Sequence, residues 1–419
     1  MPQSVLLTIT LAASVVGLIA LQETTEAADG RSHSYSLNDI VALALERNPA
    51  MAGAAAAVRQ SRGERAAAGA YLNPSINGSG GRGAIRDPST GVSIIERTVT
   101  VEQPLELPGK RRARQRAADA TLAGAQAGVE DARLNLLSDV KVAFYQLLLA
   151  QRDVELSIQN LSTTQEIFQT IKARVDAGQA RPFEAVKANV ELQKADKELS
   201  RAQNGLLVAR VRVDVLTAGS LGKNFSAAGD FSSLPQELAL DELTTRSFES
   251  HPMLRRLTKR IEQAEHSIMQ ERESRIPYIT ISGTYHREAG DEAYLAGLSV
   301  PIPLWYRRQG EIEAALGAKD RAEADRVRAE SELVSNVTEQ VQGARTARQQ
   351  IDVFEKGLLK QAEEALRIAR ISFKQGAAGL LDLIDAQRVY RQMLLEYAQA
   401  RADLSVALSR LERWTGELQ

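Results

Sequence analysis

The 419-residue sequence has no cysteine, few aromatic residues and almost no net charge. The lack of cysteine excludes a disulfide framework, a thiolate metal site and a lipid anchor attached through cysteine. The formal net charge of -1 shows no basic excess, so we expect no nucleic-acid partner. Aromatic residues make up only 5%, whereas alanine is abundant, which is more typical of closely packed helices than of a compact globular core.

Long apolar runs are also scarce. One run, SVLLTITLAASVVGLIAL at 4–21, precedes a polar stretch with small residues at Ala27 and Ala28, so we expect residues 1–28 to be a secretory signal peptide. No Lys or Arg precedes this run, and a membrane anchor is the alternative. No other run approaches the length of a spanning helix, so a protein that crosses a membrane with this sequence has to use strands.

The residue types that most often act in catalysis or bind metals do not occur at the spacings of a catalytic or metal site. The histidines are scattered without the spacing of metal ligands, at His33, His251, His266 and His286. The five methionines do not cluster, and no glycine loop for phosphate binding is present. We therefore expect no enzyme, no cofactor and no resident metal site.

The sequence contains one unit twice. The segment ERNPAM at 46–51 resembles ESHPML at 249–254, and corresponding prolines and glycines of the two halves are separated by nearly constant intervals. Pro49 and Pro252 are 203 positions apart, and Gly178 and Gly376 are 198 apart. We therefore divide the chain into a first repeat at 29–218, a linker at 219–239, a second repeat at 240–416 and a C-terminal tail at 417–419.

Each repeat is expected to contain the same elements in the same order. These are a shorter helix (37–70 and 240–275), a β-hairpin (about 74–103 and 276–303), a very long helix (110–175 and 309–374), a glycine break (Gly178, and Gly376 with Gly379) and a last helix (182–216 and 381–414). Each long helix would reach roughly 100 Å. A row of apolar residues spaced by seven predicts coiled-coil-like packing, and its members are Val140, Leu147, Val154, Leu161, Phe168 and Val175. An ordinary coiled coil is the alternative.

The segments between the helices alternate between apolar and polar residues. In the second repeat Ile279, Ile281 and Tyr285 alternate with polar residues, and in the first repeat Arg97 interrupts a similar row. Runs of about ten residues suit tilted strands that cross a bilayer. Four strands are too few to close an ordinary barrel, and open edges do not occur in lipid, so the chain would have to share a barrel with copies of itself. Three chains would give twelve strands. The alternative is a pair of small hairpins that cap a soluble helical bundle.

Proline and glycine stand where strand is expected to become helix. Proline ends a sheet ladder and is tolerated at a helix start, so we assign these residues as strand–helix hinges. The hinge residues are Pro104, Pro108, Gly109, Pro301 and Pro303. The basic clusters beside them, at 110–112 and 307–308, would meet lipid headgroups or acidic neighbours, or remain solvated.

The tandem repeat, the paired hairpins, the long helices and the glycine breaks together resemble TolC-type outer-membrane efflux proteins over nearly the whole mature chain. The segment EQPLELPGKRRAR at 102–114 further resembles the CzcC/CusC-like branch, which serves heavy-metal efflux pumps. The resemblance implies a mainly α fold with a small β part. It implies a homotrimer with a long α-helical barrel in the periplasm and a twelve-stranded transmembrane β-barrel in outer-membrane lipid. It also implies docking on a periplasmic adaptor protein and an inner-membrane pump of the resistance-nodulation-division type.

The resemblance further implies a gate at the periplasmic end. The family's acidic constriction resembles GAAGLLDLIDAQ at 376–387, with Asp382 and Asp385 as the acidic positions and Glu184 as the counterpart in the first repeat. The family's best-known latch uses a tyrosine and an arginine, and this sequence has Phe373 and Ala378 there. The leading interpretation is an export duct, with heavy-metal cations as cargo. A non-conducting periplasmic coiled-coil scaffold and a duct for drug efflux or type I protein secretion remain as alternatives.

Overall fold

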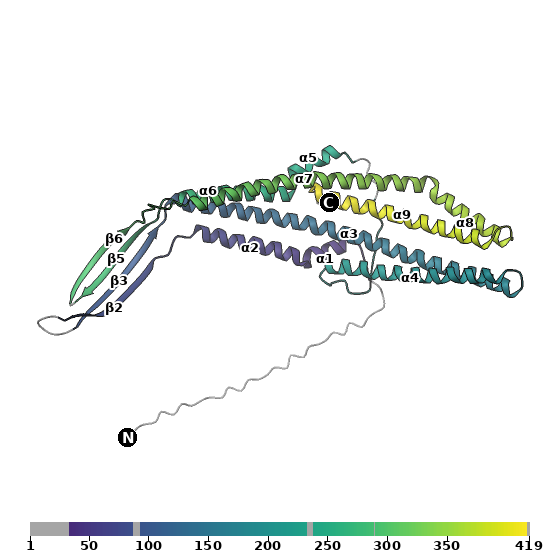
Figure 1. Ribbon diagram of the computed structural model, residues 1–419, viewed down its shortest axis with the longest axis horizontal. Helices are drawn as coiled ribbons and strands as arrows, with labels where there is room; N and C mark the ends of the chain where they lie inside the picture. The colour runs from purple at the N-terminus through teal and green to yellow at the C-terminus, as the bar shows by residue number, and fades with distance from the viewer. Residues whose placement is uncertain (1–32, 87–92, 233–237, 289, 417–419) are drawn as a thin grey trace, which may run out of the picture.

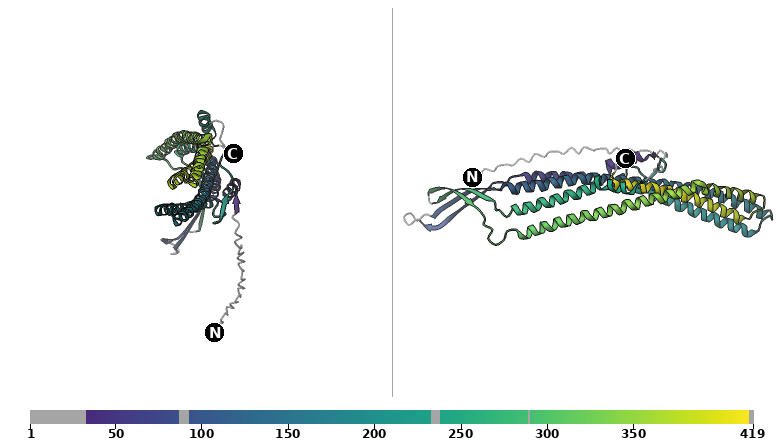
Figure 2. Two further views of the ribbon diagram at one scale, coloured as in Figure 1. Left: turned by 90° about the vertical axis from the view of Figure 1, so that its right-hand side faces the viewer. Right: turned by 90° about the horizontal axis from the view of Figure 1, so that it is seen from above.

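A computed structural model describes residues 33–86, 93–232, 238–288 and 290–416. The predicted signal peptide, the predicted C-terminal tail and residues 233–237 of the predicted linker lie outside the described residues. The described part is an elongated rod with the strands at one end and the tips of two helical hairpins at the other (Figure 1). The view from above shows the same two opposite ends (Figure 2). The fold is mainly helical with a small β part.

Both halves of the chain contain the same elements in the same order. In the first half these are α1 (Leu37–Arg47), α2 (Pro49–Gly69), β2 (Ser75–Arg86), β3 (Ser93–Leu105), α3 (Pro108–Asp176) and α4 (Pro182–Leu216). In the second half they are α5 (Leu240–Ser250), α6 (Pro252–Glu273), β5 (Ile279–Glu288), β6 (Asp291–Ser299), α7 (Gln309–Val353), α8 (Leu359–Lys374) and α9 (Leu380–Thr415). The predicted tandem repeat is therefore a repetition of structure.

The first helix of each repeat was expected to be continuous, and this expectation is wrong. The break between α1 and α2 lies at Asn48, and the break between α5 and α6 lies at His251. Both residues precede a proline, Pro49 or Pro252, and both have extended backbones, with ψ of 128° and 124°. Proline disfavours the helical conformation of the residue before it, so each helix ends there and a new one begins with proline in its first turn.

The second long helix was also expected to be continuous, and it is not. A π-helical turn at Phe354–Leu358 separates α7 from α8, and Gly357 inside it has a φ of 153°. Only glycine adopts this conformation without strain, so the helix bends at this residue. Phe354 packs edge-on against Tyr397 of α9 with ring centroids 5.8 Å apart. The uninterrupted counterpart in the first repeat is α3, with 69 residues.

The two hairpins join in one four-stranded antiparallel sheet of order β2-β3-β5-β6. The β3–β5 pairing, with Val99 opposite Tyr285, connects the first repeat to the second. One face of the sheet carries exposed apolar side chains, namely Ile76, Val99, Val101, Ile281 and Leu298. The other face is mainly polar, with Leu295 as an exposed apolar exception, and there the hydroxyls of Thr100 and Thr284 lie 3.0 Å apart. The predicted alternation is therefore present in both hairpins.

The hinge residues occupy three kinds of position. Pro108 and Gly109 lie in the first turn of α3, and Pro301 and Pro303 lie in the connection between β6 and α7. Pro104 was expected to end its strand, but it is paired with Thr280 inside β3. The pairing of β3 with β2 ends at Glu102, so β3 has a partner on one side only at Pro104, and a missing N–H is tolerated there.

Two arginines of the predicted basic clusters are bound by the protein itself. Arg111 donates hydrogen bonds to the Gly69 carbonyl at the end of α2, and its guanidinium lies 3.8 Å from the centre of the Tyr71 ring. Arg308 donates a 2.8 Å hydrogen bond from Nε to Glu271 of α6. These contacts fix the ends of α2 and α6 beside the starts of α3 and α7.

Small residues determine how closely the helices pack. The residues of α4 that are spaced by seven and buried are all alanine, at Ala188, Ala195, Ala202 and Ala209. This row allows α4 to lie close along α3 with the seven-residue period of a coiled coil. In the middle of the rod, β1 (His33–Tyr35) pairs in parallel with β4 (Phe225–Ala227), which lies within the predicted linker. This short sheet was not expected from the sequence.

Candidate functional site

The hairpins α3–α4 and α8–α9 meet at the end of the rod that is far from the sheet (Figure 1). Glycine turns the chain at both tips, because Gly178 follows α3 with a φ of 71° and Gly376 follows α8 with a φ of 74°. The Gln179 amide donates to the Arg174 carbonyl at 2.8 Å, as expected where a left-handed residue closes a helix. The predicted glycine breaks therefore position all the helices of the tips.

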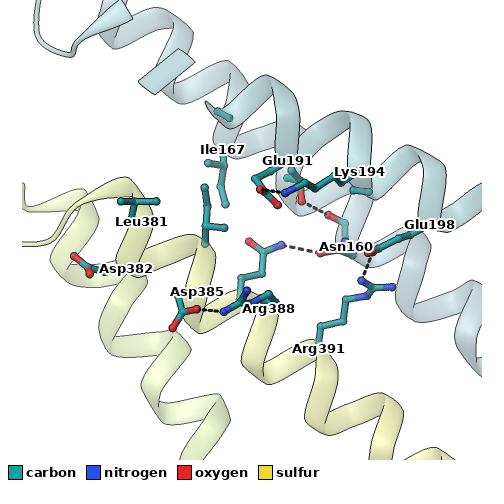
Figure 3. A pocket seen from close by; sticks show the side chains of 15 residues that line it. Asn160, Ile167, Glu191, Lys194, Glu198, Leu381, Asp382, Asp385, Arg388 and Arg391 are labelled. Carbon is teal, nitrogen blue, oxygen red and sulfur yellow. Dashed lines mark hydrogen bonds and ion pairs between the residues drawn. The ribbon is translucent and has the colours of Figure 1, made fainter. Parts of the chain in front are cut away.

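A groove of about 550 Å³ lies between the two hairpins, lined by α3, α4 and α9 (Figure 3). Charged side chains from α4 and α9 line it, and Asp382 and Asp385 are among them. The spacing of three residues places both carboxylates along the same groove.

Asp382 and Asp385 have different partners. Asp382, in the first turn of α9, accepts a 2.9 Å hydrogen bond through its carboxylate from the amide of the N-cap residue Gly379. Asp385 forms an ion pair with Arg388 one turn further along, and both side chains are exposed. The negative charge of Asp382 is therefore favoured by the helix end, and that of Asp385 is partly offset by a cation.

Glu184 lies in the first turn of α4 and is half-buried. It is not among the described residues that line the groove. Within one chain, the structure therefore brings Asp382 and Asp385 together and leaves Glu184 apart from them.

Phe373 and Ala378 occupy the positions where the resemblance implies a latch. Phe373 is buried in α8, within a cluster that includes Ile171 of α3 and Leu380 of α9. The guanidinium of Arg174 on α3 lies 4.8 Å from the centre of the Phe373 ring. Ala378 is half-buried in the turn before α9. A cation–π contact between α3 and α8 therefore lies at the position where the resemblance implies a tyrosine.

Two polar contacts between the hairpins were not predicted from the sequence. Arg391 of α9 forms an ion pair with Glu198 of α4, and Gln387 of α9 donates a 3.2 Å hydrogen bond to Asn160 of α3 (Figure 3). The partners are 193 and 227 residues apart along the chain, so no local spacing signals them. Together they connect α9 to both helices of the other hairpin.

In the described ranges, no group of three or more His, Asp or Glu side chains is arranged to hold a metal ion. Among the helices that the structure describes, none combines the length and the apolar character needed to cross a membrane.

Known proteins share this architecture. A TM-score of 0.78 relates the chain to the outer membrane channel CmeC of Campylobacter jejuni, at 18% identity over 91% of this chain and 85% of that one. In sequence, the chain is 28% identical to the cobalt-zinc-cadmium resistance protein CzcC of Cupriavidus metallidurans, over 76% of this chain and 77% of the relative. It is 25% identical to the nickel-cobalt-cadmium resistance protein NccC of Alcaligenes xylosoxydans xylosoxydans, over 75% and 71%.

The family described as "Outer membrane efflux protein" matches residues 40–219 and 243–417, which is most of the chain. The two matched segments coincide with the two runs of helices and strands that repeat in the structure. The chain therefore belongs to the outer membrane efflux protein family, the TolC-like channels of the outer membrane that extend into the periplasm, and it is a transport protein and not an enzyme.

Proposed function

We propose that three copies of this chain form the outer-membrane duct of a tripartite heavy-metal efflux system. The observation that carries the proposal is the four-stranded sheet with an exposed apolar face and two free edges, β2 and β6. Unpaired edges are unfavourable in lipid, because their backbone N–H and C=O groups find no partner there. Three sheets joined edge to edge would satisfy these groups in a twelve-stranded barrel.

The helical part of the trimer would continue this barrel as a tunnel through the periplasm. In this arrangement a periplasmic adaptor protein and an inner-membrane pump of the resistance-nodulation-division type dock on the assembly, and the pump supplies the energy. The duct itself conducts passively and uses no cofactor. TolC-family channels form trimers with efflux partners, and the particular partners named here are part of the proposal.

The cargo we propose is a heavy-metal cation. The support is the similarity to CzcC and NccC, whose names refer to resistance to cobalt, zinc, cadmium and nickel. The duct has no need of a resident metal site for this role, because a passive channel only has to let the ion pass. Selection among cations would lie with the pump and adaptor.

We place the gate at the helical tips. In a trimer, Asp382 and Asp385 would form two rings of carboxylates around a narrow axis, with Glu184 in a third position on the other hairpin. Clustered carboxylates in a confined throat attract cations. The contacts of Arg174 with Phe373 and of Arg391 with Glu198 would hold the two hairpins together in the closed state.

The proposal is tested by expressing the chain in a metal-sensitive strain that lacks its own metal-efflux duct but retains the pump and adaptor. Restored growth on cobalt, zinc or cadmium, together with a trimeric mass by light scattering and conductance in planar bilayers, is the expected result. A conducting trimer that restores drug tolerance or protein secretion, and not metal tolerance, would overturn the cargo. A stable monomer with full strand content and no conductance would identify a scaffold instead.

A further inference from the structure

Arg97 interrupts the apolar face of the sheet at the end away from the helices. Strand pairing places Arg97 of β3 opposite Arg287 of β5, with Gly80 of β2 beside Arg97 and Glu292 of β6 beside Arg287. Since side chains alternate along a strand, this row shares its face with Val99. Two arginines therefore stand side by side on the face that carries the exposed apolar residues.

Aromatic residues flank the apolar part of this face. Tyr285 and Tyr294 lie opposite each other in the row next to the arginines, with ring centroids 5.4 Å apart, and Tyr294 is 80% exposed. At the other end, where strands meet helices, Tyr278, Trp305 and Tyr306 are exposed. Membrane β-barrels carry aromatic girdles at both interfaces of their apolar band, so the pattern marks two membrane boundaries.

The spacing along the strand agrees with these boundaries. Arg97 and Leu105, the last residue of β3, are eight residues apart, which is about 27 Å along a strand. A tilt of about 40° reduces this distance to about 20 Å across the bilayer, compared with an apolar band of about 25 Å in outer-membrane barrels. The arginine row therefore lies close to the outer limit of the band, at the level of the headgroups of the outer leaflet.

The positive charge of this row is only partly compensated on its own face. Among the described residues Arg97 forms no ion pair, and it is exposed. Arg287 pairs with Glu292 at 3.5 Å, but both side chains are about half exposed, so this pair contributes little. Arg82 lies on the same face, two residues beyond Gly80 in β2. Gly80 is the strand partner of Arg97 and has no side chain that would cover the Arg97 guanidinium.

Carboxylates at the same level point to the opposite face. Glu96 pairs with Glu288, and Glu288 pairs with Asp291, in a row on the polar side of the sheet. The alternation of the strands thus places these three carboxylates on the polar face, and Glu292 is the carboxylate that shares the arginine face at this level. An anionic group outside the barrel would meet the arginines without approaching these carboxylates.

We propose that Arg97, Arg287 and Arg82 bind the phosphate groups of the phosphorylated glycolipid in the outer leaflet, that is, lipopolysaccharide. Guanidinium groups bind phosphate with two parallel hydrogen bonds, and the apolar residues below them would contact the acyl chains of the same lipid. The proposal rests on the proposed function, because it requires the sheet to face lipid.

The test measures binding of purified lipopolysaccharide to the purified trimer in mild detergent by native mass spectrometry. The variant Arg97→Gln/Arg287→Gln should bind roughly tenfold more weakly, since charge-assisted contacts to phosphate are lost. Lipopolysaccharide with its phosphates removed should bind wild type as weakly as it binds the variant, and excess inorganic phosphate should not displace the intact lipid. The matched control is Glu96→Gln/Glu288→Gln, which changes charges in the neighbouring rows of the polar face and should leave the affinity unchanged.

The outcomes separate this inference from the proposed function. Equal affinity of wild type and the arginine variant, or equal binding of the dephosphorylated lipid, overturns the inference when the same sample is trimeric and conducts normally. An equal loss of binding in the glutamate control also overturns it, because the effect would then not belong to the lipid face. A preparation without trimer or conductance overturns the proposed function itself, and the lipid site with it.

Discussion

Asn48 and His251 occupy equivalent positions in the two repeats and make the same pair of hydrogen bonds with different side chains. Asn48 accepts a 2.8 Å hydrogen bond from the Ala50 amide through Oδ1 and donates one of 2.8 Å from Nδ2 to the Leu216 carbonyl. Each residue thereby caps the second short helix of its repeat and ties it to the end of the last helix.

His251 reproduces this arrangement with an imidazole. Its Nδ1 accepts a 3.1 Å hydrogen bond from the Met253 amide, and its Nε2 donates to the Arg413 carbonyl at 3.1 Å. An amide N–H can only donate and a carbonyl can only accept, so these partners require a neutral ring with its hydrogen on Nε2. Protonation of Nδ1 would remove the cap.

The first prediction concerns pH. Burial holds the pKa of His251 below its usual value of 6.5, opposed by the Asp131 carboxylate, whereas the charges of Arg413 and Arg255 lower it further. Below about pH 6.5 this histidine binds a proton in the unfolded chain, whereas in the folded chain it stays neutral to lower pH. The free energy of unfolding should therefore be at its full value above this pH and fall as the pH drops below it. Thermal unfolding at about pH 7.5 and about pH 5.5 measures the difference.

The repeat supplies the matched variants for this test. His251→Asn should retain both hydrogen bonds, as Asn48 does, and lose this part of the acid sensitivity. Asn48→His should add a second acid-sensitive cap in the first repeat. If His251→Asn unfolds with the same pH dependence as wild type, another group is responsible.

The second prediction concerns the bend between α7 and α8. Gly357→Ala forces a side chain into a conformation with a φ of 153°, and it should lower the free energy of unfolding by about 1–3 kcal/mol. Gly317→Ala is the control, because Gly317 lies inside α7 with open space around it, and it should gain about 0.5–1 kcal/mol. Chemical denaturation measures both. Equal stability of the two variants would show that the bend does not depend on glycine.

The third prediction concerns the apolar face of the sheet. Ile281 and Leu298 lie opposite each other on β5 and β6, two residues from the inner end of the apolar band, and either change to Arg should impair membrane insertion. The expected cost lies between about 0–1 kcal/mol at the interface and about 2–4 kcal/mol at the midplane. Ser282→Arg is the control on the polar face, where Gly297 across the strand leaves room for the side chain. Membrane fractionation gives the measurement, and normal insertion of Ile281→Arg and Leu298→Arg would argue for a sheet outside lipid.

The fourth prediction concerns the carboxylates of the gate. Asp382→Asn/Asp385→Asn should reduce cation selectivity and block by multivalent cations, because two charges per chain are removed from the throat. Asparagine is chosen because its side-chain oxygen can still accept the hydrogen bond from the Gly379 amide at the start of α9. Glu184→Gln should have a smaller effect. Single-channel recording, with the blocking ion added on the tunnel side, measures selectivity and block. If the double variant is blocked as strongly as wild type, these aspartates lie on a solvated helix face and not in the gate.

The fifth prediction concerns closure. Arg391→Gln removes the ion pair with Glu198 between the hairpins, and we expect more frequent opening in single-channel recordings. The exchange Arg391→Glu/Glu198→Arg restores opposite charges and should return opening toward the wild-type level. An unchanged single variant, or a failed rescue, would show that this pair does not hold the tips together.

The repeated order of elements could be derived from the sequence, because it depends on signals that lie close together in the chain. Apolar residues at a period of two predicted the strands, and the 66-residue stretch without proline predicted a long α3. The two breaks before Pro49 and Pro252 carried an equally local signal, but the continuous helical pattern on both sides concealed it. Gly357 gave a weaker signal, since glycine inside a helix pattern most often costs only a little stability.

The helical character and the polar and apolar faces of the hairpins follow from the sequence, because each depends on neighbours within a few residues, and the tandem repeat follows from comparing the two halves of the chain. The folded chain is needed to know which strands pair, so that Arg97 lies beside Arg287, and which helices meet, so that Arg391 reaches Glu198. Contacts between residues nearly two hundred positions apart depend on the distance and rotation between packed elements, and hydrophobic periodicity specifies which face is buried without specifying which partner covers it.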